Sequence, residues 1–296
     1  MLITPRELLY GDIDLPSLPE VFIKSSELLD NPRSNANDIG EVVATDPSLT
    51  TRLLKLVNSS FYGFAAKIDT IPRAISLVGT RELRELILAT CAVEAFSGLP
   101  NELMSMNTFW RQSVRCALIA RILANQTHKD LSESMFSAGL LHNIGSLILY
   151  NRLPELAREA LSQAAFQNSP LDQAERNIIG CDHAMVGAEL MKLWNLPEIL
   201  QETTRYHHNP EAAQQYPLQT VIIQIANRII ELEESNQDIT LLLPPSAPLW
   251  KRIGLSIPVL QETLQQVDEQ FDDVLHLIYK PGKEDHTAVN KHHFSA

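Results

Sequence analysis

Basic residues and cysteines are scarce in this chain of 296 residues. It holds 24 Lys and Arg against 36 Asp and Glu, a formal net charge of −12, so it has no general electrostatic attraction for phosphate backbones or anionic lipids. We therefore expect neither nucleic acid nor a membrane as a partner. The three cysteines, Cys91, Cys116 and Cys181, lie far apart without a CxxC spacing, which argues against a disulfide framework and a thiolate zinc site.

Long hydrophobic runs are also missing. No apolar stretch approaches the ~20 residues that span a bilayer, and the N-terminus lacks a basic segment followed by an apolar one. Together with the cysteine usage, this pattern predicts a soluble protein of a reducing cytoplasm.

Strand patterns are nearly absent, and amphipathic helical stripes follow one another between Pro, Gly, Asp and Asn residues. Asp46 followed by Pro47 is typical of a helix start, with Asp as the N-cap and Pro at the first helical position. Gly63 can close the same segment. The sequence therefore predicts an all-α fold.

Polar side chains interrupt the apolar stripes in the middle of the chain. The segment 139–150, GLLHNIGSLILY, is expected to be a central helix that buries two adjacent polar residues within a seam of small ones. Other imidazole and amide groups fall in neighbouring stripes, and we expect all of them to meet at a common centre. The residues concerned are Gln112, His142, Asn143, His183, His207, His208 and Asn227.

Each of these residues also has a purely structural explanation. A single interior histidine is more often a hydrogen-bonded core residue than a ligand. Gln112 and Asn227 are expected to bond backbone carbonyls, and His207-His208 would suit a helix C-terminus, where the dipole favours a cation. No spacing has the specificity of HExxH, so the pattern alone indicates a helical protein with a polar internal cluster.

The order of the segments between about residues 15 and 230 resembles the HD superfamily, and more closely its HDOD branch. The segments that carry the resemblance are LPSLPEV, ATDPSLTTRLLKLVNSSFYG, IDTIPRAISLVG, FWRQS, GLLHNIGSLIL, and DHAMVGAELMKLWNLPEIL followed by HHNP. Active HD phosphohydrolases have a first-helix His, an adjacent His-Asp pair, in some branches two further His, and a late Asp, and these bind one or two divalent metals. The matching positions here hold Gln112, the pair His142-Asn143, His183, His207 or His208, and Asn227.

The amides that replace aspartates at these positions affect the ability of the site to bind metal ions. Two divalent cations need carboxylates to offset and bridge their charge, whereas the amides of Asn143 and Asn227 are neutral and poor bridging ligands. We therefore expect a degenerate site with no catalytic residue, no metal and no other cofactor. The alternative is a single divalent metal at His142, His183 and His207, and either of two nearby carboxylates, Glu175 or Asp182, would support it if the fold turned that carboxylate inward.

The resemblance implies a function in bacterial signal transduction, since HDOD proteins are output modules of regulatory chains such as response regulators. The first hypothesis is a non-catalytic module that contacts a regulatory protein partner. Two alternatives are a residual metal-dependent phosphohydrolase acting on a nucleotide or cyclic dinucleotide, and a sensor that binds a nucleotide without cleaving it. No companion domain is visible, so the input arrives through a partner, or the chain is a fragment of a longer regulator.

The predicted organisation is an HDOD domain over residues 14–235, with an N-terminal helical lobe over 14–100 and an HD-like bundle over 101–235. Residues 236–281 are expected to form a connector and an amphipathic C-terminal helix that covers the core, with homodimerisation through that helix as the alternative. The polar segment 282–296 is expected to be a disordered tail.

Overall fold

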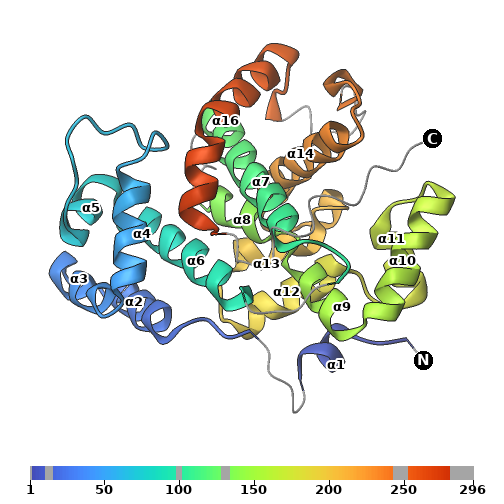
Figure 1. Cartoon of the computed structure of the whole chain (residues 1–296), viewed down its shortest axis with the longest axis horizontal. Helices are drawn as coiled ribbons and strands as arrows, with labels where there is room; N and C mark the ends of the chain where they lie inside the picture. Colours follow the sequence, from blue (N-terminus) through green and yellow to red (C-terminus); the bar gives the residue numbers. More distant parts are fainter. Residues whose placement is uncertain (1, 11–15, 98–101, 128–133, 243–252, 281–296) are drawn as a thin grey trace.

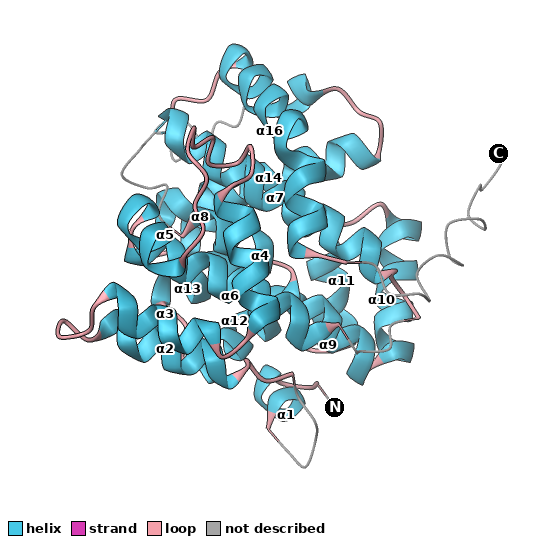
Figure 2. Ribbon diagram, turned by 60° about the vertical axis from the view of Figure 1, so that its left-hand side comes forward, coloured by secondary structure: helices cyan, strands magenta, loops and turns pink. Residues whose placement is uncertain are grey.

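The computed structural model describes residues 2–10, 16–97, 102–127, 134–242 and 253–280. All regular structure in these ranges is helical, without a strand (Figure 2), and the all-α prediction is confirmed. None of the described helices is long and apolar enough to cross a membrane.

Helices α1 to α6 make up the N-terminal part of the chain and lie on the left of Figure 1 except for α1. Their starts follow local sequence signals. Asp46 caps α4 by accepting a 2.9 Å hydrogen bond from the Leu49 backbone N–H, with Pro47 at the first position, as predicted. The bounds are α1 Pro5–Leu9, α2 Glu20–Asp30, α3 Ala36–Ala44, α4 Pro47–Val57, α5 Ile71–Val78 and α6 Thr80–Phe96.

Helix α4 ends at Val57, six residues before the glycine expected to close it. Asn58 explains the earlier end, because its side chain donates to the Ile68 carbonyl at 2.6 Å and accepts from the Ile68 N–H at 2.8 Å. That pair of bonds folds the following loop back on the helix. Gly63 lies in this loop with a φ of +62°, a conformation that glycine adopts without strain.

The later helices are arranged around α7, which packs against α8, α14 and α16. Buried residues of both the N-terminal helices and these later helices belong to a single hydrophobic cluster. The bounds are α7 Met106–Thr127, α8 Met135–Leu141, α9 Ile144–Arg152, α10 Pro154–Gln167, α11 Leu171–Ile178, α12 His183–Leu193, α13 Glu198–Tyr206, η2 Pro210–Ala212, α14 Pro217–Glu234, η3 Ile239–Leu242 and α16 Ile257–Ile278.

The prediction of one central helix over 139–150 is wrong in one respect. The helix is interrupted at His142-Asn143, so the segment forms two helices, α8 and α9. The His142 imidazole competes for a helix carbonyl, with its Nδ1 2.7 Å from the Gly139 oxygen. The seam of small residues is present. A Cβ at Gly145 would meet the His183 carbonyl oxygen at 2.0 Å, and one at Gly139 would meet the Ala117 Cα at 2.6 Å, so α9 and α8 approach their neighbours at backbone distance.

Helix α16 lies along α7 and also contacts α4 and α6 (Figure 1). It buries the apolar side expected of it, including Leu260, Val267 and Val274. Polar contacts join its other side to α7, where Arg115 forms an ion pair with Asp268 at 2.9 Å. The boundaries of the domain stay a prediction, and residues 282–296 of the predicted tail lie outside the described part of the chain.

Candidate functional site

A cavity of about 850 Å³ opens between α7, the α8–α9 break, α11, α12 and α14. The histidines and amides that the sequence places in separate helices all line it. They are Gln112, His142, Asn143, His183, His207, His208 and Asn227. The predicted common centre is therefore present as a shared cavity.

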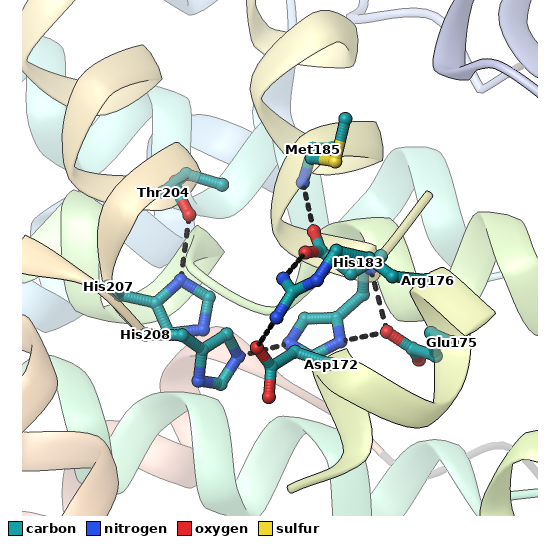
Figure 3. Close-up of polar contacts among 9 residues, drawn as sticks. Asp172, Glu175, Arg176, His183, Met185, Thr204, His207 and His208 are labelled. Carbon is teal, nitrogen blue, oxygen red and sulfur yellow. Dashed lines mark hydrogen bonds and ion pairs between the residues drawn. The ribbon is translucent and has the colours of Figure 1, made fainter. Parts of the chain in front are cut away.

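His183 begins α12, where Asp182 caps the helix by accepting from the Met185 N–H at 2.7 Å. Its backbone N–H and its ring Nδ1 both point to the Glu175 carboxylate, at 2.9 and 2.6 Å from the same oxygen (Figure 3). Glu175 is 1 % exposed. The fold thus turns Glu175 inward and leaves Asp182 to cap the helix and pair with Arg176.

His207 and His208 follow the end of α13 and approach His183 (Figure 3). The Nδ1 of His207 lies 2.7 Å from the Thr204 carbonyl oxygen, and its Nε2 has no hydrogen-bond partner although the residue is buried. The Nε2 of His208 lies 2.8 Å from the Nε2 of His183. The two histidines do lie at a helix C-terminus, as expected, but burial lowers the pKa of both, so neither is favoured as the cation that the helix dipole would stabilise.

The two amides on the opposite wall bond to side chains, which corrects the expectation that they bond backbone carbonyls. Asn227 places its Oδ1 3.1 Å from the Nε2 of His142 and donates from Nδ2 to Glu231 at 2.9 Å. Gln112 donates to Glu234. Glu231 and Glu234 are parts of the site that the sequence reasoning missed, although positions four and seven residues after Asn227 fall on the same helix face.

Burial sets the protonation of the cluster. It lowers the pKa of His142 to about 4 and that of His208 to about 2, and it lowers the pKa of His207 well below the usual range, with neighbouring histidines adding to each shift. Burial acts the same way on His183, but the Glu175 carboxylate outweighs it and raises the pKa of His183. Burial therefore favours the neutral forms of His142, His207 and His208, whereas Glu175 favours the protonated form of His183.

The donor set fits one divalent cation. Ligand nitrogens of His183, His207 and His208 all lie within 4.8 Å of one another, a set that differs from the predicted one by His208 in place of His142. The second ring nitrogen of His183 is held by a carboxylate, which is the usual support for a metal-binding imidazole. Three neutral imidazoles are an established ligand set for one such ion.

A pair of cations does not fit the same residues. Among the described residues, no carboxylate oxygen joins the three histidine nitrogens within that distance. Asp172 and Asp182 both pair with Arg176, and Glu175 faces the far side of the His183 ring. Without a bridging carboxylate, the positive charge of two adjacent ions would stand uncompensated.

Comparison with known proteins settles the relationship. A model of the HDOD domain matches residues 15–210. The chain belongs to the HDOD domain family. An uncharacterized protein of Treponema pallidum is 31% identical to this HDOD chain over 219 residues, which are 73% of the chain and 42% of that protein. The chain therefore spans less than half the length of that relative.

Solved structures share the fold of this HDOD chain. An HDOD domain protein of unknown function from Geobacter sulfurreducens has a TM-score of 0.73 at 24% identity, covering 93% of this chain and 95% of its own. A proposed phosphohydrolase from Shewanella amazonensis has a TM-score of 0.72 at 25% identity, with coverages of 90% and 95%. A proposed signal transduction protein from Marinobacter aquaeolei has a TM-score of 0.69 at 22% identity, covering 95% of this chain and 62% of its own.

Proposed function

We propose that this HDOD chain is a non-catalytic regulatory module of bacterial signal transduction that acts through contact with a protein partner. The observation that carries the proposal is the environment of Asn143 and Asn227, which stand where the active HD pattern has aspartates. The oxygen of Asn227 lies 3.1 Å from the Nε2 of His142, and its nitrogen donates to Glu231. The surface charge favours a basic or apolar partner, because the chain carries a net charge of −12.

A hydrolytic site must activate the attacking water. Hydrolysis of a phosphoester at neutral pH needs hydroxide, and metal binding supplies it by lowering the pKa of water from ~15.7 toward ~7. The paired-ion version of this chemistry needs bridging carboxylates, and those near the cluster are engaged with His183 or with Arg176. We therefore expect no phosphodiesterase turnover.

A residual phosphohydrolase is the second candidate, and one specific observation favours it. The three nitrogens of His183, His207 and His208 fit one divalent ion, and one ion can activate water in a three-histidine site. The name of the Shewanella amazonensis protein, similar at 25% identity, points the same way. In this version His183, His207 and His208 would hold the ion, and Glu175 would keep the His183 ring in place.

The two candidates differ in metal content and turnover. We expect purified protein to show no hydrolysis of a nucleotide phosphodiester or cyclic dinucleotide in Mn²⁺ or Fe²⁺. Turnover that is lost in His183→Ala but kept in His276→Ala would overturn the proposal, since His276 lies exposed on α16, away from the cavity. The variant Asn143→Asp with Asn227→Asp is expected to raise the bound-metal stoichiometry, measured by elemental analysis.

A further inference from the structure

Residues 2–9, which include α1, form a strap that is set apart from α2 to α6 and packs against α12 (Figure 1). Leu8 and Leu9 anchor it, because their side chains are 6 % and 4 % exposed although α1 has only five residues. The HDOD model matches residues 15–210, so the features that define the family do not include the strap. Its role must come from the residues that it contacts.

The start of the strap contacts the turn of residues 179–182, which joins α11 to α12. The backbone N–H of Ile3 donates to the Ile179 carbonyl oxygen at 2.8 Å. Gly180 follows with a φ of +110°, and a Cβ there would lie 2.8 Å from the Ile3 nitrogen. A residue with a side chain would be strained at this φ and would push the strap away. The turn therefore offers the strap a fitted seat at backbone distance.

The same turn fixes two residues of the cavity cluster relative to each other. Glu175 lies on α11 before the turn, and its carboxylate accepts from the backbone N–H of His183 after the turn, at 2.9 Å. Asp182, the last residue of the turn, caps α12. The turn is thus held by Glu175 on the cavity side and by Ile3 on the strap side, and a shift of the turn would separate His183 from Glu175.

We propose that the strap is a releasable element that keeps this turn, and with it His183 and Glu175, in place, so that its release loosens the histidine cavity. The anchors of the strap suit release, since besides the two leucines and the Ile3 hydrogen bond they include an ion pair of Arg6 with Glu189 in which the Arg6 side chain is 76 % exposed. In a module that acts through protein contact, release gives an event on the surface of α12 a route to the cavity. This last step rests on the proposed function.

Cys181 lies within the turn and can report on release of the strap. The residue is buried. Burial raises the pKa of its thiol, and surrounding carboxylates, with Glu7 of the strap among them, add to the shift. Cys91 and Cys116 are buried on α6 and α7, so they respond to opening of the core and serve as internal controls.

Alkylation by N-ethylmaleimide, followed by mass spectrometry of the peptide that carries each cysteine, tests the proposal. In the wild type we expect Cys181 to react faster than the other two cysteines, because a strap opens more readily than the core. Leu8→Ser with Leu9→Ser should raise the rate at Cys181 by about tenfold or more and leave the other two rates unchanged. Leu2→Ser is the matched control, since Leu2 is 67 % exposed on the same segment, and it should change none of the rates.

Hydrogen exchange tests whether the strap also holds the cavity. The backbone N–H of His183 is donated to Glu175 in the intact turn, so it should exchange faster in the variant that carries both leucine substitutions. The amides of α16 should exchange at the wild-type rate, because this helix does not line the cavity.

An unchanged rate at Cys181 in the double variant, or a parallel rise at all three cysteines, would overturn the strap as a separate releasable element. Faster alkylation with unchanged exchange at His183 would overturn its link to the cavity. If the double variant unfolds, which thermal melting would show, the wild type decides, because a Cys181 no faster than the other two cysteines contradicts the proposal. Phosphodiester turnover would overturn the non-catalytic assignment and leave these results as they are, so the two failures are distinguishable.

Discussion

The N-terminal helices and the cavity lined by histidines differ in how far apart along the sequence their hydrogen-bonded polar partners lie. In α3, α4 and α5, polar residues cap the helix they precede, within three residues of their partners. Around the cavity some partners are equally local, as with His207 and Thr204, but others are far apart, as with His142 and Asn227 at 85 residues and Gln112 and Glu234 at 122. Local polar contacts can thus be predicted from spacing, whereas the cavity network depends on how helices pack.

The largest expected loss of stability comes from a substitution at Gly145, where α9 lies against the backbone of α12. Gly145→Ala places a Cβ within 2.0 Å of the His183 carbonyl oxygen and 2.5 Å of the Gly187 nitrogen, and backbone atoms there cannot move without shifting α12. We expect a loss of about 3 kcal/mol or more in the free energy of unfolding, measured by thermal or urea denaturation. Gly187→Ala is the matched control, because its Cβ meets a Thr204 methyl at 3.0 Å, and it should lose clearly less.

Glu85 is the exception among the N-terminal helices, because it is a buried carboxyl at the contact between α6 and α8. Ser134 donates to it at 3.1 Å, and its Oε2 has no partner. Burial raises the pKa of Glu85 from 4.5 to about 7. Between pH 4.5 and 7 the unfolded chain therefore loses this proton before the folded chain does, and stability falls as pH rises.

Glu85→Gln should remove that dependence. Its stability relative to the wild type should rise by on the order of 3 kcal/mol between pH 4.5 and 8, followed as a difference in melting temperature across the pH range. Glu27→Gln, at an exposed position on α2, is the control and should track the wild type. A constant offset between Glu85→Gln and the wild type would show that Glu85 is not the group that titrates.

The cavity contains a second pair whose contribution to stability depends on pH, at higher pH than that of Glu85. Since Glu175 raises the pKa of His183 above 6.5, this pair stabilises the folded state fully below pH 6.5, and the contribution is lost as pH rises through the folded-state pKa. Glu175→Gln keeps an acceptor but removes the charge, so it should cost about 2 kcal/mol at pH 6 and little at pH 9. Glu85→Gln should still lose stability as pH rises through the pKa of His183. If both variants lacked this loss, the assignment to His183 would be contradicted.

The sequence predicted the helical class, the cap at Asp46 and the meeting of seven polar residues, because periodicity, caps and the resemblance to a family are visible along one chain. It did not predict the break at His142, which arises when a side chain takes the Gly139 carbonyl and Gly145 docks on α12. The roles of Glu231 and Glu234 were missed as well. Exposed carboxylates on a helix usually face solvent. Asn227 reaches Glu231 within α14, whereas only the packing of α7 on α14 brings Gln112 to Glu234.

The smallest expected loss of stability comes from removing a helix cap in the N-terminal part, where the polar contacts are local. Asp46→Ala removes the acceptor for the Leu49 N–H and should cost about 1 kcal/mol, roughly 2–4 °C in melting temperature. Asp46→Asn keeps an oxygen at the same place and should cost only a few tenths of that energy. Because the cap satisfies a backbone group of its own helix, neither change should alter the pH-dependent stability that Glu175 and His183 contribute at the cavity. An effect of Asp46→Ala on that pH dependence would show that the N-terminal helices and the cavity are energetically coupled, which their contacts do not require.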